Sequence, residues 1–265
     1  MNLPRIARVE CDGFEYSIFA TGDFLSQQVF RNGTWGKVQH KLTELLVKGY
    51  DAPVVLDVGA NIGLYTVPMA SLVSGLGGKL LAFEPQRIVF QQLCANIFAN
   101  RLDCVWAYNQ AVGAAPGVIA LPTFDYAQTK NIGAFSLDVD LQKLRGLEEG
   151  LDRSKPESVD MISLDALDFP GQVRVVKIDV EGFEVEVIRG GKAFFESQGF
   201  PPIIFEAWEG EWFSEQRKAL FSAVEAQGYA VTRLATDEFL AQHPSYGARV
   251  EVVTDGNRIN LTRVR

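Results

Sequence analysis

The stretch VVLDVGANIGLYT, residues 54–66, combines a β-branched apolar run with one acid and two glycines. An apolar run of strand length that ends in Asp-x-Gly and leads into a helical pattern is typical of the first strand, turn and helix of a βαβ unit. Gly59 and Gly63 let the backbone pass close to a ligand, because they carry no Cβ. The stretch therefore predicts a nucleotide-binding turn in an α/β domain.

Further apolar runs continue this alternation of strands and helices. Between KLLAFE and CVWAYN, the segment QRIVFQQLCANIFANR has apolar residues at near-helical spacing. The pattern predicts a mostly parallel sheet with helices on both faces, and GYAVTRL (228–234) and RVEVVT (249–254) are expected to be late strands that pair antiparallel at an edge. The other expected strands are 79–84, 104–109, 173–179 and 201–208.

Two regions fall outside the alternation. Residues 1–50 are expected to form a lead-in that packs on the core, with a hairpin and the amphipathic helix VQHKLTELLVKG. Residues 51–265 form the main domain, and its segment at about 113–170 is longer than a simple strand connection. A long insertion beside a sheet is often a lid or a binding loop, so we expect its part at about 121–158 to cover the substrate.

The composition excludes several classes of protein. The chain has 265 residues, 47% of them hydrophobic, which is ample for a globular core, and its net charge of −8 disfavours binding to nucleic acid. No apolar run approaches the roughly 18 residues of a membrane helix, and MNLPRIARVECDGFEYS does not resemble a secretion signal. The three cysteines and two histidines lack metal-ligand spacing. We therefore expect a cytoplasmic protein with no metal site and no nucleic-acid or membrane partner.

The glycine turn also indicates which nucleotide it holds. Glu84 ends the second strand, where an acid commonly binds the hydroxyls of a ribose. The dinucleotide fingerprint G-x-G-x-x-G is absent, since Asn61 stands where the middle glycine admits a pyrophosphate. Asp57 would repel an anion and favours a ligand with an amine and a sulfonium. These features predict S-adenosylmethionine, with an ordinary tight turn as the alternative for Gly59.

Five motifs in order resemble one family: LDVGANIGLYT, AFEP, NQAVG, VKIDVEGFEVEVIRGG and PPIIFEAW are similar to the FkbM-type methyltransferases, a branch of the class I S-adenosylmethionine-dependent enzymes. The resemblance covers roughly residues 23–208. It implies a Rossmann-like sheet of about seven strands, S-adenosylmethionine as cofactor, and O-methylation of a hydroxyl on a sugar, glycan or natural-product small molecule. It also implies that the methionine end is lined by Asp57, Gly59, Asn61 and Gly63, the ribose is held by Glu84, and the adenine lies near Gln110, Ala111 and Val112.

Three acids are candidates for the chemical step. Asp179 and Glu181 follow a buried strand whose carboxyl end opens on the ligand crevice, so a carboxylate there can take the proton of an attacking hydroxyl. The alternative is that Glu181 caps the next helix and Asp179 orders the loop. Glu206 ends the fifth strand, where the family also has an acid, and is either a second base or acceptor contact or an ion-pair partner. Lys177, inside an apolar strand, is expected to pair with an acid.

The segment KNIGAF lies in the insertion, and the family has an Asn-x-Gly element in this region. Asn131 and Gly133 therefore either approach the acceptor or cofactor or form a plain turn. Two other functions stay open: an NAD(P)-dependent oxidoreductase, for which YAQTK supplies a Tyr-x-x-x-Lys spacing, and a non-catalytic S-adenosylmethionine-binding module. The sequence does not identify the acceptor or the oligomeric state.

Overall fold

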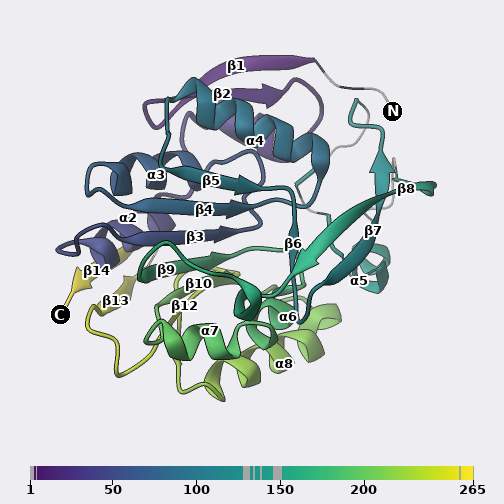
Figure 1. The fold of residues 1–265 in the computed structure, drawn as a ribbon. Coiled ribbons are helices and arrows are strands. Elements are labelled where there is room, and N and C mark those ends of the chain that lie inside the picture. The colour runs from purple at the N-terminus through teal and green to yellow at the C-terminus, as the bar shows by residue number, and fades with distance from the viewer. Residues whose placement is uncertain are drawn as a thin grey trace.

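The apolar runs of the sequence come together in one seven-stranded sheet, which lies at the centre of the molecule (Figure 1). The computed structural model describes the chain except residues 1, 2, 4, 128–131, 134, 138, 146–150, 257 and 265 and the side chains of residues 139, 140 and 142. The sheet has the order β11-β12-β10-β9-β3-β4-β5, in which only β12 runs antiparallel to its neighbours. Its strands are β3 (Val54–Val58), β4 (Lys79–Phe83), β5 (Val105–Tyr108), β9 (Val173–Ile178), β10 (Ile203–Glu206), β11 (Ala230–Arg233) and β12 (Glu238–Gln242).

Both faces of this sheet are covered, as its fully apolar strands require. Successive side chains of a strand point to opposite faces, so Val54, Leu56 and Val58 pack with residues of α6, α7 and α8, whereas Val55 packs with residues of α2, α3 and α4. The predicted α/β fold with a mostly parallel, Rossmann-like sheet of seven strands and helices on both faces is confirmed. The helices are α2 (Lys37–Val47), α3 (Thr66–Ser74), α4 (Arg87–Ala99), α6 (Glu184–Arg189), α7 (Lys192–Ser197) and α8 (Ser214–Glu225), with 3-10 turns at Leu164–Ala166 and Glu211–Phe213.

The lead-in contains an antiparallel hairpin, β1 (Ile6–Cys11) and β2 (Phe14–Phe19), followed by α1 (Phe24–Asn32) and α2. The hairpin lies beside α4 (Figure 1), where the side chain of Asn96 accepts a hydrogen bond from the amide of Ser17 at 2.8 Å. Asp23 caps α1, since its carboxylate accepts from the amide of Ser26 at 2.9 Å. The lead-in therefore reaches the sheet through α4 and α2.

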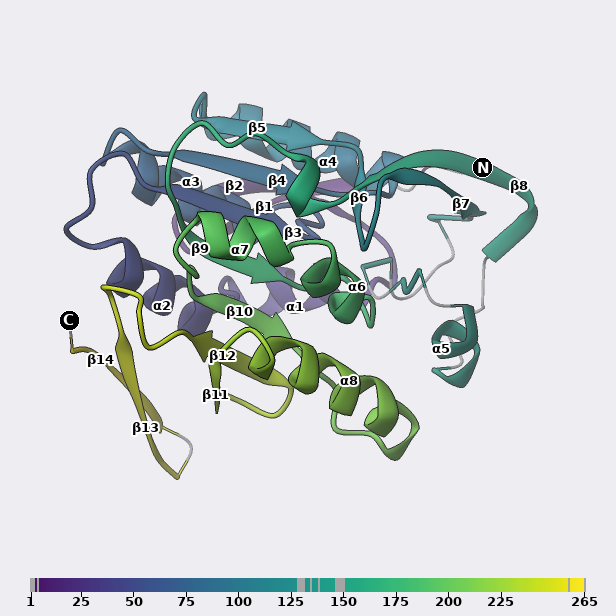
Figure 2. The same cartoon turned by 60° about the horizontal axis from the view of Figure 1, so that its bottom comes forward.

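The insertion has a small sheet of its own, in the order β6-β8-β7. Figures 1 and 2 show its long β7–β8 hairpin extending away from the central sheet, with α5 near its far end. Cross-strand pairing satisfies the backbone groups of this polar segment, which explains how it folds without a large core of its own. Its elements are β6 (Ala111–Val112), β7 (Gly117–Phe124), α5 (Val139–Leu144) and β8 (Leu151–Ile162).

The end of the chain differs from the expectation at one strand. Residues 228–234 contain β11, an edge strand of the central sheet as expected, but residues 249–254 do not join that sheet. They lie in a separate hairpin of β13 (Val250–Asp255) and β14 (Arg258–Arg263), which projects from the body in Figure 2. The sheet is completed instead by β12, which the sequence analysis did not predict. Within the described part of the chain, no helix combines the length and apolar character needed to cross a membrane.

Candidate functional site

A cavity of about 300 Å³ opens at the carboxyl ends of β3, β4, β9 and β10. This is where the chain order of the strands reverses, because β4 lies on one side of β3 and β9 on the other, and ligands of open α/β sheets bind at such a point. The lining of the cavity includes most of the residues that the sequence nominated. They are Gly59, Asn61, Glu84, Gln110, Ala111, Val112, Gly133, Asp179, Glu181 and Glu206.

Two nominated residues are placed differently, and a third is not among the residues that the structure describes. Asp57 and Gly63 do not line the cavity. Gly63 has φ +95°, and a Cβ there would lie 2.8 Å from the side chain of Leu93, so this glycine permits the packing of the turn before α3 on α4. Asn131 lies outside the described residues. Its predicted contact with the acceptor or cofactor therefore stays a prediction.

The glycine turn is tight for a specific reason. Gly59 has φ +83°, and a Cβ on it would lie 1.8 Å from the backbone oxygen of Asp179, so no other residue fits between β3 and the loop after β9. Gly133 of the insertion is equally close to Asn61, because a Cβ on Gly133 would lie 2.2 Å from Asn61 Nδ2. Because Gly59 and Gly133 have no side chain, the turn after β3, the loop after β9 and the insertion can meet at the cavity.

Glu84 is held rigidly at the wall of the cavity. Its carboxylate oxygens accept hydrogen bonds from the amides of Asn61 at 3.0 Å and Gln86 at 2.8 Å. The side chain is only 5% exposed, and burial raises the pKa of Glu84 to about 7 in spite of these bonds. Each carboxylate oxygen has more than one lone pair, so each can accept a further hydrogen bond from a ligand hydroxyl.

Asp57 acts beneath the cavity rather than at its surface. It pairs in register with Lys177 of β9, and the Lys177 ammonium lies 3.2 Å from Asp57 Oδ1 and 3.3 Å from Asp179 Oδ2. Lys177 also donates to the carbonyl of Gly59 at 3.0 Å, and Asp57 Oδ2 accepts from Thr66 Oγ1 at 2.5 Å. Burial alone disfavours the ammonium, but the two carboxylates outweigh it and the pKa of Lys177 is raised. The expectation that Lys177 pairs with an acid is confirmed.

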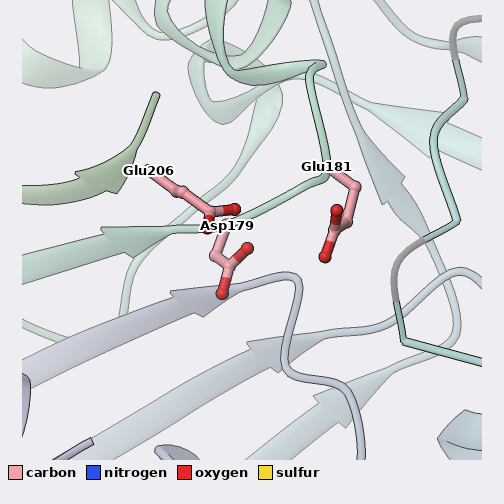
Figure 3. Close-up of side chains that lie close together, drawn as sticks. All are labelled: Asp179, Glu181 and Glu206. Atoms are coloured by element: carbon pink, nitrogen blue, oxygen red, sulfur yellow. The ribbon is translucent and has the colours of Figure 1, made fainter. Parts of the chain in front are cut away.

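The three candidate catalytic acids converge at the other side of the cavity. Figure 3 shows the side chains of Asp179, Glu181 and Glu206 projecting into the same space beyond the strand ends, and one oxygen of each lies within 4.8 Å of the others. Burial, followed by the charge of Asp179, raises the pKa of Glu181 to about 8 and that of Glu206 to about 10. This spacing is also short enough for a shared metal ion, an arrangement that the sequence analysis did not identify.

The alternative role for Glu181, capping of the helix that follows, does not match its contacts. Glu181 has φ +57° and forms an ion pair with Arg145 at 2.7 Å, while α6 has Phe183 as its N-terminal cap residue and no side-chain cap. The carboxylate of Glu184 holds the loop instead, because it accepts from the amides of Val180 at 3.0 Å and Gly182 at 3.2 Å. Glu181 is thereby left facing the cavity.

The carboxylate of Glu206 has no ion-pair or hydrogen-bond partner among the described residues, so the alternative that it serves an ion pair finds no support in their contacts. It ends β10, from where its carboxylate faces Asp179 in Figure 3. An acid without a cation beside it is stabilised in its protonated form, which agrees with its raised pKa.

Several cavity residues were not nominated from the sequence. Arg145 lies with its guanidinium 4.0 Å from the ring centre of Trp208, which follows β10. Gln86 donates to the carbonyl of Ile132 at 3.1 Å and thereby ties the insertion to the turn after β4. No local motif marks these residues, since each depends on segments that are distant in the sequence.

Comparison with known proteins identifies the family of the chain. The model of the methyltransferase FkbM domain matches residues 57–231. Methyltransferase sdnD of Sordaria araneosa is 27% identical over 211 residues, 68% of this chain and 75% of the relative, and Methyltransferase 1 of Beauveria bassiana is 27% identical over 154 residues, 53% and 59%. The crystal structure of methyltransferase FkbM from Methylobacillus flagellatus KT has a TM-score of 0.47 at 16% identity, over 72% of this chain and 43% of that one. Because the family model spans more than half of its length, the chain belongs to the FkbM methyltransferase domain family and is a methyltransferase.

Proposed function

We propose that the protein is an S-adenosylmethionine-dependent O-methyltransferase that acts on a hydroxyl of a sugar, glycan or natural-product small molecule. The observation that carries this proposal is the division of the cavity between two kinds of acid. Glu84, fixed by backbone amides, follows β4 on one side of β3, whereas Asp179 follows β9 and Glu206 ends β10 on the other side. A ligand that crosses β3 presents its ribose to Glu84 and its reactive end to the other acids.

The cofactor end suits an adenosyl group in three respects. Glu84 keeps lone pairs for two ribose hydroxyls, and Gly59 leaves the backbone of the turn uncovered. Gln86 lines the same wall, is 6% exposed, and its Oε1 has no hydrogen-bond partner among the described residues. A buried amide oxygen without a donor is costly, so a donor of the ligand, after a small rotation of the amide, would relieve it.

When bound, S-adenosylmethionine supplies a methyl group on a positively charged sulfur. The acids Asp179, Glu181 and Glu206 then have two tasks, which are to orient the acceptor hydroxyl and to remove its proton as the oxygen attacks. Glu184 and Lys177 keep the loop of Asp179 and Glu181 in place, so that the acceptor oxygen is held in line with the methyl group. Positioning is expected to supply much of the acceleration.

The oxidoreductase alternative gains no support from the geometry. Asn61 occupies the place of the middle glycine, with Gly133 directly against its side chain, and so obstructs a pyrophosphate. Tyr126 lies in a turn after β7, not on the long helix that the Tyr-x-x-x-Lys motif requires, and only 4% of it is exposed. The proposed acceptor is a small molecule or glycan, the cytoplasmic location stays a prediction, and neither nucleic acid nor a membrane is part of the proposal.

The test of this function is binding followed by transfer. Titration calorimetry should detect S-adenosylhomocysteine and no NADH, and Glu84→Ala should weaken the binding by the equivalent of one or two charge-assisted hydrogen bonds, each about 1.5 to 3 kcal/mol. Transfer of a radiolabelled methyl group to a hydroxylated acceptor separates an enzyme from a non-catalytic binding module. Binding of NADH alone would overturn the proposal, and an unchanged affinity of Glu84→Ala would move the ribose elsewhere.

A further inference from the structure

Part of the cavity wall comes from outside the family match. The match spans residues 57–231, yet Phe24, Trp35 and Gln39 of the lead-in and Glu238 of β12 also line the cavity. The cofactor end and the three acids lie within the match. A shared fold and cofactor site do not determine the substrate. Residues that flank the match can therefore recognise a particular acceptor.

Two of these flanking residues offer open aromatic surface. Phe24, the first residue of α1, is 56% exposed although it is large and apolar, and Trp35 is partly exposed. Neither ring forms an aromatic pair with another ring in the described portion of the chain. Four other rings of the wall are buried, namely Tyr65, Phe83, Phe135 and Phe205, and Trp208 has one face covered by the Arg145 guanidinium. The uncovered aromatic surface at the cavity is therefore supplied chiefly by the lead-in.

The segment that carries Trp35 is fixed in advance. The carboxylate of Asp12 accepts from the amide of Trp35 and from the hydroxyl of Thr34, each at 3.0 Å. Gly33 ends α1 with φ +62°, and Gly36 begins α2 with φ +61°, so the connection turns sharply at both ends. A preorganised aromatic side chain loses little conformational freedom when a ligand packs on it.

A polar link joins this wall to the acids. Gln39 of α2 donates to Glu238 Oε1 at 3.0 Å, and Glu238 lies directly opposite Glu206 in the ladder of β10 and β12. The lead-in is thus connected both to the aromatic surface and to the edge where the acceptor hydroxyl must lie.

We infer that the α1–α2 segment of the lead-in recognises the acceptor, and that the acceptor is a hydroxylated six-membered ring with one apolar face. This inference rests on the proposed function. The C–H face of such a ring packs on Phe24 and Trp35, because flat aromatic surfaces bury flat apolar faces well. A hydroxyl at the ring edge then faces Glu206 and Asp179. An open-chain polyol has the same hydroxyls but no persistent flat face.

The test compares rings with their open-chain counterparts on protein loaded with S-adenosylhomocysteine. Saturation-transfer NMR measures binding of methyl pyranosides and of the corresponding alditols, such as methyl β-galactopyranoside and galactitol. We expect binding of pyranosides and not of alditols. Phe24→Ala and Trp35→Ala should each weaken pyranoside binding roughly fivefold, with the affinity for S-adenosylhomocysteine unchanged.

Matched controls exist on the same molecule. Phe30 is 69% exposed on α1, and Trp106 is 41% exposed on β5, and neither lines the cavity. Phe30→Ala and Trp106→Ala should leave pyranoside binding unchanged. If S-adenosylhomocysteine does not bind the wild type, the proposed function fails and this inference fails with it. If S-adenosylhomocysteine binds, three results overturn this inference alone. Either no pyranoside binds, or alditols bind as well as pyranosides, or the Phe24 and Trp35 variants behave like their controls.

Discussion

Replacing Lys177 by methionine tests the buried charge network on which the candidate site rests. The Lys177 ammonium is the cation that Asp57 and Asp179 share, and Asp57 has no exposed surface. Removing one partner of a buried ion pair leaves an uncompensated charge and typically costs about 3 to 5 kcal/mol. This is a large part of the roughly 5 to 15 kcal/mol that stabilises a domain. We therefore expect Lys177→Met to lower the free energy of unfolding by several kcal/mol.

Urea denaturation at pH 7 measures this loss as a lower midpoint at constant slope. Lys218→Met is the control, because Lys218 and its partner Glu215 are 73% and 80% exposed and such pairs contribute about 0 to 1 kcal/mol. The double variant Lys177→Met/Asp57→Asn removes both charges, so it should recover much of the stability. A cost of Lys177→Met below about 1 kcal/mol, or no recovery in the double variant, would refute the reasoning.

Three further outcomes follow from single contacts. Burial raises the pKa of Glu206 to about 10, so the folded protein keeps a proton that the unfolded chain loses above about pH 4.5. The free energy of unfolding should therefore fall as pH rises from 5 to 9, by at most about 1.4 kcal/mol per pH unit. Urea midpoints measure this fall, which should be smaller for Glu206→Gln. Gly133→Ala would place a Cβ 2.2 Å from Asn61 Nδ2, so calorimetry should show weaker S-adenosylhomocysteine binding, whereas Gly117→Ala, with only Met161 at 4.0 Å, should not. Glu184→Ala removes the hydrogen-bond acceptor of the amides of Val180 and Gly182. It should lower turnover, measured by radiolabel transfer, more than cofactor affinity, measured by calorimetry. Equal losses would contradict a role in positioning the acids.

The central sheet could be predicted because its strands are buried on both faces. Each such strand appears in the sequence as a continuous apolar run, and the carboxyl ends of parallel strands meet at one edge. That rule alone brings Glu84, Asp179 and Glu206 to one cavity. It also makes Asp57 and Lys177 neighbours once the register of β3 and β9 is set. The sequence did not show that Asp57 would pair with Lys177 and would not line the cavity.

The rest of the cavity depends on contacts that no local pattern encodes. Arg145 reaches Glu181 across 36 positions, and Gln39 reaches Glu238 across 199. Strand β12 lies between β10 and the edge strand β11, and its apolar run covers only residues 239–241 between two polar residues, so it does not stand out in the sequence. The sequence analysis also missed Phe24 and Trp35 as cavity residues, because they belong to a segment that resembles an ordinary amphipathic lead-in.

The three acids of the cavity are not equivalent, and their environments assign them different tasks. Glu206, whose pKa is raised to about 10, carries its proton at pH 7 and can donate a hydrogen bond to the acceptor oxygen but cannot take its proton. Glutamine keeps a donor in the same place, so Glu206→Gln should lower turnover by less than about tenfold. Asp179 pairs with the Lys177 ammonium at 3.3 Å, and its carboxylate lies beside that of Glu206 in Figure 3, so it is placed to receive the proton. Asp179→Asn should therefore lose at least about 10²-fold in turnover, with S-adenosylhomocysteine affinity nearly intact.

Glu181 is the intermediate case, since its pKa is raised to about 8 while Arg145 favours its charged form. A bound sulfonium would add a positive charge to the cavity and favour the charged form of Glu181, so Glu181 is the acid whose protonation would change on cofactor binding near neutral pH. Glu181→Gln should then shift the pH dependence of turnover and lower its maximum less than Asp179→Asn does. The measurement is the pH profile of methyl transfer for the three variants beside calorimetric affinity. If Glu206→Gln loses as much turnover as Asp179→Asn, the proton is removed by Glu206 or by the acids acting as one unit, and the assignment of Asp179 as the base is wrong.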